Sequence, residues 1–261
     1  MLGLVVGNGT LPKHLVDARK DKPLIAGVDG TTPSVPTDLT FRLSHIASFI
    51  ATLKDQGITE LCFAGGVTRP NLNPGEVEPE SLPFVQRLVT AIQSGDGGAL
   101  DIVLAIFEEA GFRIKGAHQV VPDLLPPAGV LTNTNPRPAD ETAIPRAETL
   151  LSTMGQADLG QACVLNKGQP IAVEALFGTD FMLQSLANRP DGAGGFLYKA
   201  PKPDQDRRID LPTIGPTTIE SAEKAKLDGV IIAADGVLLL NRKATIAAAD
   251  AKGLYIWVKA P

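Results

Sequence analysis

The chain has 261 residues, of which 44% are hydrophobic and 20% charged, and its formal net charge is −5. This length allows one large domain or two smaller ones, each able to bury an apolar core. The net negative charge argues against a broad nucleic-acid-binding surface. No apolar run approaches the roughly 18–20 residues that span a membrane, so an integral membrane protein is not expected.

The amino terminus, MLGLVVGNG, lacks the basic segment of a secretory signal peptide and is typical of a first buried strand. Cys62 and Cys163 both fall in predicted buried strands, where free thiols behave as small hydrophobic side chains. A reduced, cytoplasmic protein without a structural disulfide is therefore expected.

The first half of the chain alternates predicted strands and helices, which is the order of a Rossmann-like parallel sheet. The expected strands are 2–6, 24–28, 58–63 and 111–121, and the expected helices are 11–20, 44–56, 82–93 and 100–110. His118 lies inside the last of these strands, where a lone histidine is more typical of a hydrogen-bonded structural residue than of a ligand.

Two glycine-rich loops follow strands of this sheet and are expected at the edge where open α/β sheets bind ligands. They are Gly7, Asn8 and Gly9 after the first strand, and Ala64, Gly65 and Gly66 after the third. Arg69 follows closely enough to meet an anion there. The alternative is a pair of tight turns without a ligand, with Arg69 an ordinary exposed side chain. The first loop is a weak dinucleotide fingerprint, because Pro12 stands where a third glycine would be.

Residues 133–145 contain three prolines among polar residues and are predicted to be a linker. We therefore expect a Rossmann-like N-terminal domain over 1–132 and a mixed α/β catalytic domain over 146–261, with a cleft between them. In the second domain two hairpins are expected, 162–165 with 171–175 around a Lys167-Gly168 turn, and 229–233 with 237–240. Helices are expected at 146–155, 181–187, 217–227 and 241–251, with a closing strand at 254–258.

The stretch from Lys199 to Gly215 combines both signs of charge with a stiff backbone. It holds Lys199, Lys202, Arg207 and Arg208 beside Asp204, Asp206 and Asp210, with prolines at 201, 203 and 212. Prolines remove backbone freedom and donors, so an ordered loop is expected rather than a helix. Such a loop suits a site for phosphate and a divalent metal. A solvated, self-paired charge run explains the spacing equally well.

Just upstream, Gly178, Thr179 and Asp180 are expected to start the helix 181–187. Thr179 is a suitable N-cap, and a carboxylate at Asp180 suits the positive end of the helix dipole. These roles would explain both residues without any ligand.

Several function classes find no support in the sequence. There is no zinc-ligand spacing among three histidines and two separated cysteines, no G-x-S-x-G motif and no P-loop lysine. A Rossmann oxidoreductase is disfavoured by Pro12 and by the weak case for Asp29 as a ribose-binding acid. A non-catalytic nucleotide or phospho-ligand binding protein stays open as an alternative to an enzyme.

The most specific signal is a series of motifs that follow one another along nearly the whole chain. They are LGLVVGNGTLP at 2–12, FAGGVTRP at 63–70, GFRIKGAHQVVPDLL at 111–125, FGTDFML at 177–183, KAPKP at 199–203, RIDLPTIG at 208–215 and ATIAAADAKGLYIW at 244–257. In these motifs the chain resembles the UDP-2,3-diacylglucosamine pyrophosphatases of the LpxI type.

The resemblance implies hydrolysis of UDP-2,3-diacylglucosamine to UMP and 2,3-diacylglucosamine 1-phosphate (lipid X) in lipid A synthesis, with water attacking the α-phosphorus. It also implies a divalent metal, usually Mg²⁺, and a homodimer. The expected location is the cytoplasm, with transient contact at the inner-membrane surface.

The resemblance also assigns roles to residues of this chain. Asp210 matches the aspartate of the family's DLPTIG motif and is the expected metal ligand and essential carboxylate, acting with Lys199 and Asp180 in catalysis. Its alternative role is a buried salt bridge with Arg208 or Lys199. The expected substrate-binding residues are Gly7, Asn8, Gly9, Ala64, Gly65, Gly66, Arg69, Gly178, Thr179, Lys202 and Thr213.

The chain departs from the family pattern at Phe177, where relatives carry Glu, and at Gly97, where they carry a second acidic residue after Asp96. The acyl chains of such a substrate need an apolar wall. The candidates for it are Phe177, Phe181, Met182 and Leu186, whose helical spacing fits an ordinary core equally well.

Overall fold

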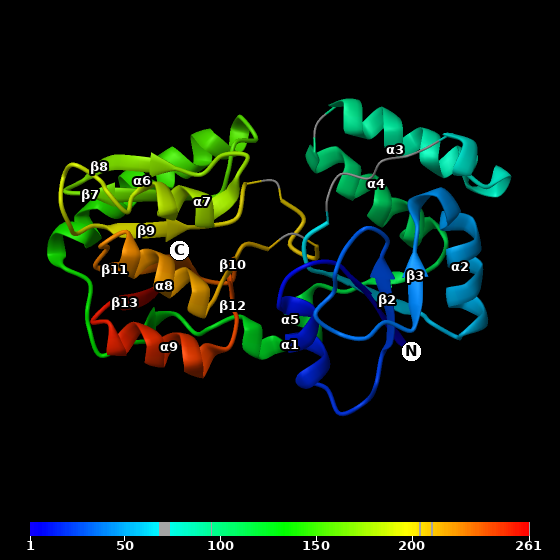
Figure 1. The fold of residues 1–261 in the computed structure, drawn as a ribbon, viewed down its shortest axis with the longest axis horizontal. Helices are drawn as coiled ribbons and strands as arrows, with labels where there is room; N and C mark the ends of the chain where they lie inside the picture. Colours follow the sequence, from blue (N-terminus) through cyan, green and yellow to red (C-terminus); the bar gives the residue numbers. More distant parts are fainter. Residues whose placement is uncertain (68–73, 95, 204, 210, 261) are drawn as a thin grey trace. The chain divides into compact units, whose positions relative to one another are not determined.

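The protein is described from a computed structural model that covers residues 1–67, 74–94, 96–203, 205–209 and 211–260. The chain forms two compact units, an N-terminal unit, Met1–Pro122, and a C-terminal unit, Asp123–Pro261. Both are drawn in Figure 1. No helix among the described residues is long and apolar enough to cross a membrane.

The N-terminal unit is built on a five-stranded sheet in the order β3-β2-β1-β4-β5, and neighbouring strands pair in parallel. Its strands are β1 (Leu2–Val6), β2 (Leu24–Val28), β3 (Leu39–Phe41), β4 (Glu60–Ala64) and β5 (Arg113–Ile114). Its helices are α1 (Leu11–Asp17), α2 (Ile46–Asp55), α3 (Leu82–Ser94), α4 (Asp96–Glu109) and α5 (Ala117–Val120). This arrangement confirms the predicted Rossmann-like parallel sheet.

One predicted strand of this unit is wrong in extent. The run 111–121 contributes only β5 to the sheet, and His118 lies in the short helix α5. The side chain of Gln119 accepts a hydrogen bond from the Gly116 backbone N–H at 2.9 Å, which supports the helical turn. A short apolar run does not by itself distinguish a strand from a buried helical turn.

The C-terminal unit is built on a six-stranded mixed sheet in the order β6-β13-β11-β9-β7-β8. Its strands are β6 (Gly129–Val130), β7 (Ala162–Asn166), β8 (Gln169–Val173), β9 (Phe196–Lys199), β11 (Gly229–Ala233) and β13 (Tyr255–Lys259). The hairpin of β7 and β8 is confirmed, and its turn residues Lys167 and Gly168 both have positive φ, 50° and 72°. Those angles match a type I′ turn, which suits the strand twist.

The second predicted hairpin is wrong. Strand β11 lies between β9 and β13, parallel to both, while β12 (Leu238–Leu239) pairs in parallel with β10 (Thr213–Ile214). Val230, Ile231 and Ile232 of β11 are 0% exposed. A strand that is apolar on both faces is most stable in the middle of a sheet covered on both sides, and this preference outweighs the local turn signal.

The predicted linker also differs from the structure, because helix α6 (Pro138–Gln156) begins inside the segment 133–145. The two units divide earlier, between Pro122 and Asp123. Pro138 occupies the first turn, where a backbone N–H is not needed. Pro145 lies inside the helix, and the buried stripe of α6 outweighs its cost. This stripe comprises Ala143, Ile144, Ala147, Leu151 and Met154.

Helices cover both faces of the C-terminal sheet (Figure 1). Helix α6 packs on one face, and α7 (Gly178–Ser185), α8 (Pro216–Lys224) and α9 (Arg242–Ala251) pack on the other. Along β9, Phe196 and Tyr198 belong to the core under α6, whereas Leu197 belongs to the core under α7 to α9. Because strand side chains alternate, Lys199 faces the same side as Leu197.

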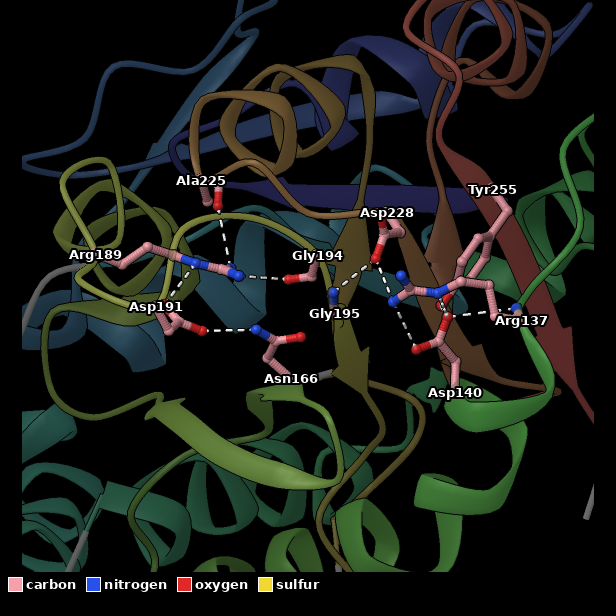
Figure 2. A network of polar contacts seen from close by, with 10 residues as sticks. All are labelled: Arg137, Asp140, Asn166, Arg189, Asp191, Gly194, Gly195, Ala225, Asp228 and Tyr255. Atoms are coloured by element: carbon pink, nitrogen blue, oxygen red, sulfur yellow. Dashed lines mark hydrogen bonds and ion pairs between the residues drawn. The ribbon is translucent and has the colours of Figure 1, made fainter.

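A polar network ties the amino ends of β9 and β11 to the surrounding loops (Figure 2). The buried Arg189 donates to the carbonyls of Gly194 at 2.7 Å and Ala225 at 3.3 Å, and forms an ion pair with Asp191 at 2.9 Å. The carboxylate of Asp191 accepts from the Asn166 amide at 2.6 Å.

The same network continues toward α6 and β13. The Asp228 carboxylate accepts from the Gly195 backbone N–H at 2.7 Å and pairs with Arg137. Arg137 also binds the buried Asp140, which accepts from the Tyr255 hydroxyl at 3.2 Å. Burial beside Asp140 raises the pKa of that hydroxyl far above its ordinary value. These groups satisfy one another, so we interpret the network as structural.

Candidate functional site

The carboxyl end of β9 carries a buried ammonium group held by two other segments. The Nζ of Lys199 donates to the hydroxyl of Thr179 at 2.8 Å and to the backbone carbonyl of Thr213 at 3.2 Å. Lys199 is 7% exposed and Thr179 is 9% exposed. The structure thus brings together three residues that the sequence had proposed for one site, from β9, α7 and β10.

Thr179 reaches this position in a different role from the one expected. The N-cap of α7 is Phe177, the helix starts at Gly178, and Thr179 lies inside the first turn with no N-cap bond. The prediction of Thr179 as the N-cap is therefore wrong. Its hydroxyl is turned inward to Lys199 instead, because a buried hydroxyl and a buried ammonium each require a partner.

Thr213 contacts Lys199 through its backbone, since it is the main-chain carbonyl that accepts the bond. The Thr213 hydroxyl donates to the Leu211 carbonyl at 3.3 Å and is only half-buried. The side chain of Thr213 therefore does not hold Lys199, and the predicted contact of its hydroxyl with substrate remains a prediction.

The proline-rich loop after Lys199 is packed at the carboxyl edge of the sheet. Pro203 lies against Gly155 of α6, and Pro201 lies against Gly236, where any larger residue than glycine would collide with the proline ring. Pro201 and Pro203 are therefore held against neighbouring glycines, and the chain leaves the sheet here at the edge where parallel strands end. That edge is the usual ligand-binding edge of open α/β sheets.

Two charged pairs of the loop are satisfied within the protein. Lys202 forms an ion pair with Asp158 at 2.5 Å, and Arg208 binds both carboxylate oxygens of Asp206. Arg208 also holds the pKa of the Asp206 carboxyl below its ordinary value, so this carboxylate stays ionised. The Arg208–Asp206 pair matches the alternative of a charge run that pairs with itself, whereas Lys202 pairs with a residue outside the run. The phosphate-clamp role of Lys202 remains a prediction.

The predicted Mg²⁺ site is not formed by the described residues alone. Among them there is no group of three or more His, Cys, Asp and Glu side chains that could hold a metal. Asp180 is exposed in the first turn of α7. Asp210, the expected ligand, lies outside the described residues, as do Asp204 and Arg69.

Glu174 is a further acidic residue near this site that the sequence did not single out. It is 8% exposed, and within the described part of the chain its Oε2 atom has no hydrogen-bond partner. Its backbone N–H donates to Ala162, and Ala162 lies opposite Lys199 in the neighbouring strand. Residues directly opposite each other on neighbouring strands point to the same face of a sheet. Glu174 and Lys199 therefore lie on either side of Ala162, on the face that α7 covers.

The sequence signal for Glu174 was available but ambiguous. Glu174 directly follows β8, and the partner strand β7 is fully buried. A carboxylate in that position is expected to be buried at the end of the hairpin. Its position relative to Lys199 follows only from the register in which β7 pairs with β8 and with β9.

The two glycine loops of the N-terminal unit lie side by side, as the parallel sheet predicted. They bind each other: the Asn8 N–H donates to Gly66 at 2.8 Å and the Gly66 N–H donates to Asn8 at 2.9 Å. A Cβ at Gly7 or Gly65 would collide with the facing backbone at 2.3 or 2.5 Å. Close packing accounts for these two glycines, and the Asn8 and Gly66 amides are already engaged within the protein.

Comparison with known proteins agrees with the motifs in the sequence. The family model of the LpxI N-terminal domain matches residues 1–124, and that of the LpxI C-terminal domain matches residues 127–257. A protein of Caulobacter vibrioides, the UDP-2,3-diacylglucosamine pyrophosphatase LpxI, is 35% identical over 269 residues, which cover 98% of this chain and 96% of the relative. The junction of the two family models coincides closely with the division between the compact units.

Proposed function

Because the chain belongs to the LpxI family over both of its domains, we propose that it is a UDP-2,3-diacylglucosamine pyrophosphatase of lipid A synthesis. Its products would be UMP and 2,3-diacylglucosamine 1-phosphate. The observation that supports this most directly is the buried Lys199 ammonium, positioned by Thr179 and Thr213 at the ligand-binding edge of the C-terminal sheet.

In the proposed reaction a water molecule attacks the α-phosphorus of the UDP group. The new bond joins the water oxygen to that phosphorus, and the bond from the phosphorus to the bridging oxygen breaks. The bridging oxygen leaves with the sugar 1-phosphate, and the water oxygen stays in UMP. Lys199 stabilises the negative charge that develops on the phosphate oxygens. Such electrostatic stabilisation of the transition state is usually the largest single effect in enzyme catalysis.

Asp210 is proposed to accept the proton of the attacking water, with Asp180 as a second carboxylate at the first turn of α7. We also propose that Asp210 would be the ligand of a divalent cation, Mg²⁺. The described residues alone do not form a complete site for it. Such a cation, when bound, neutralises phosphate charge.

The remaining contacts are proposed on the family resemblance. Substrate would be bound by Gly178 and Lys202 near the catalytic lysine, and by the two glycine loops with Arg69 in the N-terminal unit. We further propose a homodimer, and a cytoplasmic enzyme that meets its lipid substrate at the membrane surface.

The test is release of UMP from UDP-2,3-diacylglucosamine by the purified protein, with Mg²⁺ or with EDTA, in ¹⁸O-labelled water. We expect metal-dependent release with the label in UMP, and no turnover by the Asp210→Asn variant. Label in the lipid 1-phosphate would contradict attack at the α-phosphorus. Tight substrate binding without turnover would favour a binding protein. The presence of Phe177 in place of the family Glu would then be the first candidate cause.

A further inference from the structure

Three large apolar side chains are exposed together where α7 begins. Leu176 is 84% exposed, Phe177 is 72% exposed and Phe181 is 56% exposed. The rings of Phe177 and Phe181 are in contact, with centroids 5.0 Å apart. We call these three residues the α7 apolar surface.

This exposure is not a consequence of poor packing of the helix. The opposite side of α7 contributes Met182 and Leu183 to the core, where they are 4% and 0% exposed, and Leu186 follows at 6%. The expected apolar wall of four residues is therefore divided, with Met182 and Leu186 in the core and the two phenylalanines outside. An exposed cluster of aromatic and aliphatic side chains is characteristic of an interaction surface.

The α7 apolar surface borders the candidate site. Phe177 and Thr179 are separated by one residue, and Thr179 accepts the hydrogen bond of Lys199. The surface faces outward while Thr179 faces inward, so the helix start carries the partner of Lys199, the proposed phosphate-binding group, on one side and apolar side chains on the other. A lipid with a phosphorylated head group likewise has a charged phosphate at one end and apolar acyl chains at the other.

We propose that the α7 apolar surface inserts into the interfacial region of a lipid bilayer, so that the enzyme draws the head group of its substrate to Lys199 while the acyl chains remain in the membrane. This inference rests on the proposed function. Protruding side chains suit a bilayer better than a single acyl chain, which would leave most of their surface in water. Phenylalanine and leucine are residue types found on the apolar face of helices that lie in this interface.

The charge next to the α7 apolar surface determines which kind of membrane it is expected to bind. Asp180, between Phe177 and Phe181, is exposed and acidic. Attraction to anionic head groups is therefore not expected to drive binding at this point, in contrast to a basic amphipathic helix. Insertion of apolar side chains should give binding to uncharged phosphatidylcholine vesicles that changes little with salt.

The experiment is sedimentation of the full-length protein with phosphatidylcholine vesicles in the absence of substrate. A variant that combines Phe177→Ser and Phe181→Ser should partition into vesicles at least about tenfold less than the unchanged protein. Serine at the N-cap position preserves the start of α7. The matched control is Val130→Ser, an exposed apolar residue at the opposite edge of the same sheet, which should bind vesicles normally.

Activity provides a second readout. For the double variant we expect the KM to rise more on substrate in vesicles than on substrate dispersed in detergent. Absence of vesicle binding by the unchanged protein, or equal binding by the double variant, would overturn the proposal. An equally raised KM in detergent would assign the surface to the substrate's own acyl chain instead.

Two further outcomes would also overturn it. A change of oligomeric state in the double variant would show that a second copy covers the surface, and a large loss of thermal stability would show that the chain itself covers it. Vesicle binding is measured without substrate, so failure of the proposed enzymatic activity would not be mistaken for failure of this inference.

Discussion

The ammonium of Lys199 lies 2.8 Å from the hydroxyl of Thr179, although the two residues are 20 positions apart in the chain. Their contact joins the end of β9 to the first turn of α7 and fixes the direction in which the lysine points. A cation fixed in advance at the place where charge develops can stabilise a transition state without further rearrangement.

Replacing this cation should remove most activity. Lys199→Met is expected to lower kcat about 10²- to 10³-fold, because a fixed donor for the developing phosphate charge is lost. Circular dichroism and thermal melting should show a folded protein, since methionine fills the space of the lysine stem. Lys224→Met, at an exposed lysine of α8, is the matched control and should retain full activity. Retention of activity by Lys199→Met would remove Lys199 from the mechanism.

The two threonines around Lys199 should have separable effects. Thr179→Val removes the side-chain acceptor and is expected to lower kcat about three- to tenfold, whereas Thr179→Ser should restore it. Thr213→Val leaves the carbonyl bonded to Lys199, so any effect of the lost hydroxyl should appear in KM. Steady-state kinetics of UMP release distinguish the two, and a matching fall in kcat for both valine variants would refute this division.

Glu174 should show opposite effects on stability and activity. Its buried Oε2 atom has no partner among the described residues, and an unsatisfied buried carboxylate costs free energy. Glu174→Gln is therefore expected to raise the free energy of unfolding by about 1 kcal/mol. It should lower kcat, because the carboxylate faces the same side of the sheet as Lys199. Urea denaturation and UMP release test this, and a destabilised variant would mean that the carboxylate has a structural partner.

The network at the amino ends of β9 and β11 should give acid-sensitive stability. A hydrogen bond from Asn166, followed by the charge of Arg189, lowers the pKa of Asp191 in the folded protein. The stabilisation is thus complete above the unfolded pKa of about 3.9 and is lost as the pH falls through the lower folded value. The melting temperatures of the unchanged protein and Asp191→Asn should differ by a constant amount from pH 6 to about pH 5, and should approach each other only as the pH falls below about 3.9. Parallel curves would contradict this contribution.

Local pattern was sufficient for much of the architecture. The alternating apolar runs of the first half predicted the parallel sheet, and the Lys167-Gly168 turn predicted the β7–β8 hairpin, because in both cases neighbouring residues determine the geometry. Local patterns failed where tertiary packing decided the outcome. Strand β11, buried on both faces, pairs with β9 and β13 and not with the next strand, and α6 continues through Pro145 because its apolar stripe is buried.

For the site, the sequence alone singled out Lys199, Thr179 and Thr213 by motif and by charge, and it identified the family through motifs spread over the chain. Only the tertiary structure decided that Thr179 is a partner of Lys199 and not an N-cap, and that Glu174 lies on the same face. It also separated Phe177 from Met182, two residues with the same helical spacing signal. The reason is physical: sequence fixes residue chemistry and local period, whereas the partner of a buried group depends on which strands and helices pack together.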